Sequence, residues 1–481
     1  MRLSALLLLP LSLALASASQ EPLVNSQPTD EPTVEPAAEP TPKNAYLAST
    51  ELFPPGPEVA HLTTGSTLDI EPPLSPRHEK AKAQLLDSLI RTPQNWARSH
   101  PRYRLLEVLH GLRRHEYRYV EQLREWGEAY QTLPEAQREL IRASTTYHTN
   151  FDLIRNLWPK NGALATNILE HALEYYEMDP AELASYIETA EAQRSWDYQP
   201  SITDALNHLV RDWTADGAHE REPTYAPILA TIKDLLAKHP ADAGTFKVLV
   251  PGAGLGRLAH EIAALDPRIE VTANEYSAYM NTCYRYVTTL RTPSSTSWHP
   301  YINWWSHQPS LAETTRAVHM PDVSINSSSV LWIEGDFLRE FASEEGAYHA
   351  IVSLFFIDTA KSSLDYLDAF SRLLVPGGSW LNLGPLLYGS SPKLQLNLND
   401  LLAVSEAMGF AFQPTPEEFG PLTLPHRTAR ARELGYLYNA RSMRRNTYQA
   451  QFWVARKESR TYTPFPPPEA EPYNFAPGSH F

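Results

Sequence analysis

Cysteine is almost absent from this sequence. Cys283 is the only one among 481 residues, so the chain cannot form an internal disulfide. Positive charge is also scarce, because 41 lysines and arginines face 56 aspartates and glutamates and leave a formal net charge of −15. We therefore expect no nucleic acid as the main partner, since phosphate binding requires clustered basic charge.

Long hydrophobic runs are missing after the amino terminus, so we expect no membrane-spanning helix. The one apolar run, residues 3–15, follows Arg2 and precedes small residues at 16–18. This order is typical of a secretory signal peptide, which we predict over residues 1–18. It indicates the secretory pathway or an extracellular location, where the lack of disulfides is unusual.

Composition divides the rest of the chain into four parts. Residues 19–77 are rich in proline, glutamate and threonine and poor in apolar residues, which predicts a disordered linker. Apolar residues then recur three and four apart through residues 78–240, which predicts a helical region. We expect a sheet-containing domain over residues 241–457 and a proline-rich tail over residues 458–481.

The most informative stretch is FKVLVPGAGLGRLAH at residues 246–260. An apolar β-branched run meets a turn with Gly252, Gly254 and Gly256, and a helical pattern follows at once. Glycines let the backbone approach a ligand closely, and the helix start offers free N–H groups, as in a nucleotide-type α/β sheet. Arg257 stands where the dinucleotide fingerprint has its third glycine, which disfavours the alternative of a nicotinamide-dependent oxidoreductase.

Further apolar strands end in polar residues. Glu275 ends the second strand, where an acid suits a ribose diol. The third ends in Asp336 and Phe337, a carboxylate and a ring that can hydrogen-bond and stack on adenine. The fourth ends in Asp358, and the fifth, within residues 373–384, follows a Pro-Gly-Gly turn. Strands that alternate with helices predict a doubly wound parallel sheet, whose ligands bind beyond the carboxyl ends of the strands.

This order of motifs resembles class I S-adenosylmethionine (SAM)-dependent methyltransferases, and within them the carnosine N-methyltransferase (N2227-like) family. The resemblance is carried by VPGAGLGRLAHEIA, NEYSAYMN, PDV (321–323), GDF, FFIDTA (355–360), NLGPLLYG (382–389) and, before the sheet, RDWTADGAHEREPTYAPIL (211–229). It covers roughly residues 78–457. It implies an α/β fold with a Rossmann-like class I methyltransferase sheet and an N-terminal helical domain.

The resemblance implies a SAM-dependent N-methyltransferase that acts on an imidazole nitrogen of carnosine or a related histidine-containing dipeptide. A neutral imidazole has a free lone pair near neutral pH, so the transfer requires no strong base. A carboxylate that accepts a hydrogen bond from the other ring N–H would fix the tautomer and stabilise the cation that forms. Asp358 is the candidate, because it matches the imidazole-contacting aspartate of the family motif. The alternative is that Asp358 caps a helix.

The expected SAM contacts come from three strand ends. The methionine part is expected on Gly252 and Gly254, the ribose on Glu275, and the adenine on Asp336 and Phe337. No metal site is expected.

Two residues before the sheet complete the expected cofactor site. By resemblance, Arg211 contacts the carboxylate of the donor. This would offset the acid that the superfamily usually has before the first glycine, where Pro251 stands here. His208 lies one helical turn before Arg211, at a position where the family usually has glutamine, and its alternative is a structural role.

The acceptor side departs from the family. The family's LLYH block, whose histidine helps to bind the dipeptide, ends here in Gly389, which has no side chain to bind with. The carboxy-terminal tyrosine-rich block is reduced to residues 446–448, with Tyr448 as the contact carried over. Another imidazole compound or a peptide histidine therefore stays open as acceptor, and a non-catalytic SAM-binding module is a further alternative.

Location, assembly and one insertion are also left with alternatives. The resembled family is mostly cytosolic and nuclear, so the cytoplasm or nucleus is the alternative if the signal is not used. We expect a small-molecule or dipeptide partner, with a homodimer as one open oligomeric state. Residues 293–329 form a long insertion with three tryptophans, which predicts either a lid or a hydrophobic plug.

Overall fold

The computed structural model describes residues 75–91, 98–193, 199–389, 392–458 and 462–465. These residues belong to one compact unit, Glu71–Phe481. The predicted signal peptide, nearly all of the predicted linker and most of the tail lie outside the described residues. The division into a helical region and a sheet domain stays a prediction.

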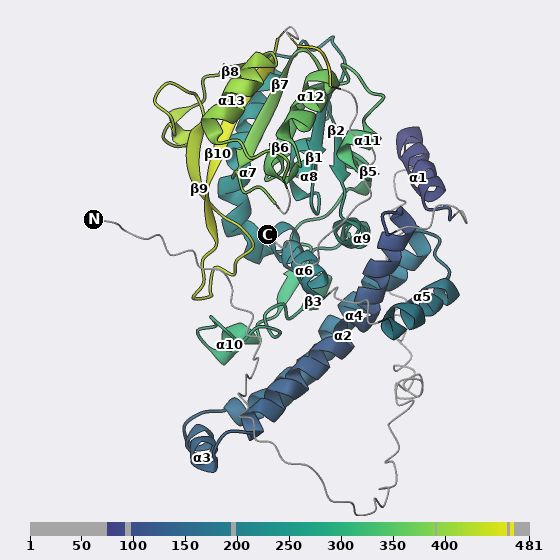
Figure 1. Ribbon diagram of the computed structural model, residues 1–481, viewed down its shortest axis with the longest axis vertical. Helices are drawn as coiled ribbons and strands as arrows, with labels where there is room; N and C mark the ends of the chain where they lie inside the picture. Colours follow the sequence, from purple (N-terminus) through teal and green to yellow (C-terminus); the bar gives the residue numbers. More distant parts are fainter. Residues whose placement is uncertain (1–74, 92–97, 194–198, 390–391, 459–461, 466–481) are drawn as a thin grey trace, which may run out of the picture. The chain divides into compact units, whose positions relative to one another are not determined.

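A mixed sheet of eight strands lies at the centre of the unit (Figure 1). Its five parallel strands are those that the sequence predicts: β1 Phe246–Pro251, β2 Ile269–Glu275, β5 Val330–Glu334, β6 Tyr348–Leu354 and β7 Leu374–Gly384. They lie in the order β5-β2-β1-β6-β7, so the order reverses between β1 and β6. Ligands of doubly wound sheets bind outside the carboxyl ends of the strands at such a switch point. The predicted Rossmann-like α/β fold is confirmed.

Antiparallel strands extend the sheet beyond β7, and the sequence did not predict them. They are β8 Phe410–Gln413, β9 Arg430–Gly435 and β10 Thr447–Lys457. One edge of β10 pairs with β7, and its other edge pairs with β9 and then with β8. The loop between β9 and β10 is therefore held at the carboxyl end of β7, because Gln451 of β10 pairs with Gly384 at that end.

Two hydrophobic clusters pack against the two faces of the sheet. Val248 and Val250 belong to one cluster and Leu249 to the other, because successive side chains of a strand point to opposite faces. The helices that connect or follow the strands are α8 Arg257–Ala263, α9 Ala278–Val287, α11 Phe337–Glu340, α12 Ser363–Leu373 and α13 Leu398–Ala407.

Helices dominate the chain before β1, as predicted. They are α1 Pro76–Ser88, α2 Pro101–Gln131, α3 Glu135–Ser144, α4 Tyr147–Tyr175, α5 Pro180–Ala192, α6 Gln199–Trp213 and α7 Ala218–Ala237. The long helices α2 and α4 lie side by side (Figure 1). In the part of the chain that the structure describes, no helix is both long and apolar enough to cross a membrane. The end of α6 matters most for function, because the indole N–H of Trp213 donates to the carbonyl oxygen of Leu255 in the glycine turn at 2.8 Å.

The insertion between β2 and β5 folds into short elements of its own. They are β3 Thr296–Trp298, α10 Leu311–Thr314 and β4 Val318–Met320, with β3 and β4 paired antiparallel. The ring of Trp305 packs against Trp126 and Phe151 of the long helices, with ring centroids 5.3 and 5.1 Å away. Trp304 is 54% exposed. One tryptophan thus acts as a plug, while its neighbour stays at the surface.

Candidate active site

The glycine turn after β1 can be built only from glycine at its key positions. Gly252 and Gly254 have φ angles of +61° and +59°, which L side chains rarely adopt. A Cβ atom on Gly252 would also overlap the ring of Phe356, which follows β6. The turn is therefore packed closely against the segment that follows β6.

Glu275 at the end of β2 lies against this turn. Its carboxylate accepts hydrogen bonds from the backbone N–H groups of Gly254 at 2.8 Å and Ser277 at 2.7 Å. Burial raises the pKa of Glu275, and these backbone donors oppose the rise. The structure thus brings together two of the predicted cofactor contacts from adjacent strands.

Asp336 and Phe337 begin α11 next to Glu275. The N–H of Gly335 donates to the backbone carbonyl oxygen of Glu275 at 3.0 Å, which fixes the two segments together. The carboxylate of Asp336 caps α11 by accepting from the N–H of Leu338 at 2.9 Å. The ring of Phe337 is buried in an aromatic group, 5.7 Å from the ring of Phe356. Asp336 is thus near the predicted ribose contact, whereas Phe337 packs in the core behind it.

Asp358 follows β6 in a short 3-10 helix, Ile357–Thr359. Its carboxylate is 4% exposed and accepts a hydrogen bond from the N–H of Leu387 at 2.8 Å. Burial raises the pKa of Asp358 to about 6. The alternative of a helix cap is wrong for α12, because Ser362 precedes that helix.

The other predicted acceptor contacts lie near Asp358. Gly389 follows two residues after Leu387, in the segment that leaves β7. The ring of Tyr448, from β10, lies 6.2 Å from the ring of Phe355, which directly follows β6. Leu387 thus links the segment of Gly389 to Asp358, and Phe355 links Tyr448 to the segment that contains Asp358.

Arg211 and His208 lie on the last turns of α6. The guanidinium of Arg211 lies over the ring of Tyr436, 5.3 Å from its centroid, and its Nη1 is 3.4 Å from a carboxylate oxygen of Asp212. Its Nε is buried and has no hydrogen-bond partner among the described residues. The ring of His208 lies 5.9 Å from the ring of Tyr436, and burial lowers its pKa to about 3, so it is neutral.

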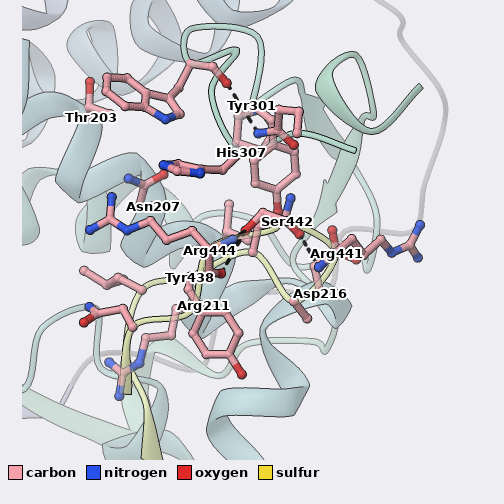
Figure 2. A pocket seen from close by; sticks show the side chains of 18 of the residues that line it. Thr203, Asn207, Arg211, Asp216, Tyr301, His307, Tyr438, Arg441, Ser442 and Arg444 are labelled. Carbon is pink, nitrogen blue, oxygen red and sulfur yellow. Dashed lines mark hydrogen bonds between the residues drawn. The ribbon is translucent and has the colours of Figure 1, made fainter. Parts of the chain in front are cut away.

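A cavity of about 610 Å³ opens beside Arg211 (Figure 2). Its volume is within the range of about 300–1,000 Å³ of small-molecule sites. Its walls come from α6, from the insertion around residues 300–308 and from the β9–β10 loop at residues 436–446. Figure 2 shows side chains from all three walls around the cavity, such as Asn207, Tyr301 and Tyr438.

Specific hydrogen bonds hold the β9–β10 loop in this place. The carboxylate of Glu220, from α7, accepts from the backbone N–H groups of Leu437 at 2.8 Å and Tyr438 at 3.0 Å. The N–H of Met443 donates to the carbonyl oxygen of His307 in the insertion at 2.7 Å. The loop and the insertion thus close the cavity together.

Tyr436 connects the cavity with the strand ends, and sequence reasoning missed it. Its ring stacks on that of Phe355 at 4.8 Å and lies 6.3 Å from that of Tyr448. No motif or periodicity marks Tyr436, because its position depends on the antiparallel strands that the sequence did not predict.

A buried network of charges fixes the end of α6. Asp322 accepts from Arg221 and from Arg257, each at 2.6 Å. These two arginines donate in turn to the backbone carbonyl oxygens of Arg211 at 2.6 Å and Asp212 at 2.9 Å. Two motifs of the resemblance, PDV and the block before the sheet, therefore meet in one structural unit.

Comparison with known proteins identifies the family of the chain. A family model described as carnosine N-methyltransferase matches residues 189–459. A carnosine N-methyltransferase of Schizosaccharomyces pombe is 32% identical over 282 residues, which cover 54% of this chain and 71% of the relative. One of Mus musculus is 30% identical over 341 residues, which cover 68% of this chain and 79% of the relative.

Solved structures resemble the chain only distantly. Phosphoethanolamine N-methyltransferase 2 of Haemonchus contortus, in complex with S-adenosyl-L-methionine, is 13% identical with a TM-score of 0.28, covering 48% of this chain and 53% of that one. The strand order establishes the fold. The family match spans more than half of the chain and confirms the resemblance seen in its motifs: the chain belongs to the carnosine N-methyltransferase family.

Proposed function

We propose that this protein transfers a methyl group from SAM to an imidazole nitrogen of carnosine or a related histidine-containing dipeptide. The observation that carries this proposal is the buried carboxylate of Asp358 at the switch point of the sheet. It is two residues from Phe356, whose ring contacts Gly252 in the glycine turn. A donor on the turn and an acceptor on Asp358 would therefore be neighbours.

The residues at the strand ends fit SAM. Glycines let the backbone of the turn approach a ligand closely, and Glu275, which accepts from the N–H of Gly254, has the acidic group that suits a ribose diol. The buried Nε of Arg211, without a hydrogen-bond partner among the described residues, suits the carboxylate at the amino-acid end of SAM. When bound, SAM would supply an electrophilic methyl group on its sulfonium sulfur.

Asp358 would orient the acceptor and stabilise its charge. A carboxylate has about four lone-pair sites, so it can accept an imidazole N–H in addition to the N–H of Leu387. This hydrogen bond would leave the other ring nitrogen with its lone pair toward the methyl group. The ring becomes a cation on methylation, and a fixed negative charge in a buried site stabilises such a developing charge strongly.

The cavity would hold the rest of the acceptor. Tyr436 lines it and stacks on Phe355, three residues before Asp358, whereas Asp358 is not among the residues that line it. The acceptor would therefore place its ring beside Asp358 and extend past Tyr436 into the cavity. Gly389 supports a second candidate, which is transfer to a different imidazole-bearing acceptor, because the family's histidine side chain is missing at this position.

A methyl-transfer assay with mass detection tests the proposal. The protein is incubated with SAM and carnosine, and the product should carry one additional methyl group. Asp358→Asn should lower the rate about 100-fold or more, with the affinity for SAM nearly unchanged. The matched control Asp365→Asn, in the first turn of α12, should keep wild-type activity. If the wild type fails to bind SAM, the proposal is wrong. If it binds SAM and methylates no imidazole compound, a non-catalytic binding module takes its place.

A further inference from the structure

A second acidic residue lies at the glycine turn, although Pro251 occupies the position where the superfamily usually has one. This residue is Asp212 of α6, which is 2% exposed. Its Oδ2 lies 4.0 Å from the point where a Cβ on Gly254 would stand, so nothing but the missing side chain separates the two. A carboxylate thus reaches the turn from a helix instead of from β1.

The position of Asp212 is tightly fixed. The indole N–H of the following Trp213 donates to the carbonyl oxygen of Leu255 in the turn, at 2.8 Å. The carbonyl oxygen of Asp212 itself accepts from Arg257, the first residue of α8, at 2.9 Å. The end of α6 is therefore bound to the carboxyl end of the turn, at Leu255 and Arg257, and Asp212 cannot move away from the turn without breaking these contacts.

The carboxylate of Asp212 accepts a hydrogen bond from the backbone N–H of Leu255 in the turn, whereas its hydrogen bonds to other side chains are long. The hydroxyl group of Tyr225 lies 3.5 Å from Oδ1, beyond the usual range for such a bond. The Nη1 of Arg211 is 3.4 Å from the same oxygen. The buried Nε of Arg211 makes no hydrogen bond to the described residues and lies 3.6 Å from a carboxylate oxygen of Glu220. A buried negative and a buried positive group thus lie side by side at the turn, both with capacity for stronger hydrogen bonds.

The charges of Asp212 and Arg211 are complementary to those of an α-amino acid. An α-amino acid carries an ammonium and a carboxylate on one carbon, and SAM has this group at its methionine end. We propose that Asp212 binds the α-ammonium of SAM, in place of the acid that is missing at residue 251, while Arg211 binds the α-carboxylate. This inference rests on the proposed function, because it assigns one more contact to the same cofactor site.

Calorimetric titration with three ligands tests the assignment. The ligands are S-adenosylhomocysteine, its analogue without the α-amino group, and 5′-methylthioadenosine, which lacks the whole amino-acid end. Asp212→Asn should weaken S-adenosylhomocysteine about 10- to 100-fold, the effect of one hydrogen bond between charged groups. The affinity for 5′-methylthioadenosine should change less than about threefold, because that ligand does not reach Asp212. The control Asp234→Asn, an exposed position of α7, should change neither.

The wild type gives an independent measurement if the variant folds poorly. It should bind the deaminated analogue about 10- to 100-fold more weakly than S-adenosylhomocysteine, and this difference should disappear in Asp212→Asn. Equal binding of these two ligands by the wild type would overturn the assignment and leave the proposed function intact. An equal loss of all three ligands in the variant would assign Asp212 to the structure of the turn alone. A wild type that binds none of them would contradict the proposed function as well.

Discussion

Asp358→Asn should stabilise the protein while it removes activity. In the folded protein, burial raises the pKa of Asp358 from 3.8 to about 6. Between these pH values the folded protein holds a proton that the unfolded chain has released. The free energy of unfolding therefore falls as pH rises through this window, and the loss is complete above about pH 7.

The size of this effect follows from the shift in pKa. The rise in pKa from 3.8 to about 6 means that ionised Asp358 costs the folded wild type about 3 kcal/mol at neutral pH. Asparagine has nearly the same shape, stays neutral and can still accept the hydrogen bond from Leu387. For a unit of about 400 residues, about 3 kcal/mol corresponds to a rise in Tm of about 3 to 4 °C.

Thermal unfolding of both proteins between pH 4 and pH 8 is the assay. The difference in Tm between variant and wild type should be near zero at pH 4 and reach its full size above pH 7. Taking this difference cancels the titration of all other groups, and Asp234→Asn should show no such pH-dependent difference. A variant that is less stable than the wild type at pH 8, or a difference that does not vary with pH, would refute the reasoning.

Other sites give further predictions. Gly252→Ala should abolish SAM binding and lower Tm, because the new Cβ would overlap Phe356 and the residue has a positive φ. The control Gly346→Ala has open space around it and should lower the free energy of unfolding by only about 1 kcal/mol. Titration with SAM and thermal unfolding check both variants. Asp322→Asn should lower the free energy of unfolding by about 3 to 5 kcal/mol, because two buried arginines lose their shared carboxylate. Denaturant titration measures this loss, and a value below about 1 kcal/mol would contradict a stabilising role of Asp322. Glu220→Gln should raise the KM for the acceptor several-fold in steady-state assays, because one of two loop amides loses its acceptor; an unchanged KM would mean that the loop does not bind the acceptor.

The parallel strands could be predicted because each is a short apolar run next to a glycine or proline turn. The antiparallel strands could not. The sequence of β9, RARELG, contains three charged residues and lacks a hydrophobic alternation. The segment is a strand because it pairs with β10, and its own sequence pattern does not predict one. The strand β10 does contain a buried run, but it lies beyond the motifs that drew attention to the first five strands.

The residues of the candidate site also fall into those that the sequence could predict and those that it could not. Glu275, Asp336 and Asp358 could be placed from the sequence, because parallel strands bring their carboxyl ends to one edge of a sheet. Asp212 and Tyr436 could not, because they reach that edge from a helix and from an antiparallel loop. Their places depend on how separate elements pack, and no local pattern contains that information.

Besides holding the β9–β10 loop, Glu220 contacts Arg211. One of its carboxylate oxygens accepts from the loop at Leu437 and also lies 3.6 Å from the Nε of Arg211. A ligand that draws Arg211 toward itself would therefore weaken the contact of Arg211 with Glu220, whose carboxylate also holds the β9–β10 loop. Binding of the donor should then change the affinity for the acceptor, and binding of the acceptor should change the affinity for the donor by the same factor. Glu220 is therefore the side chain through which we expect donor and acceptor binding to be coupled.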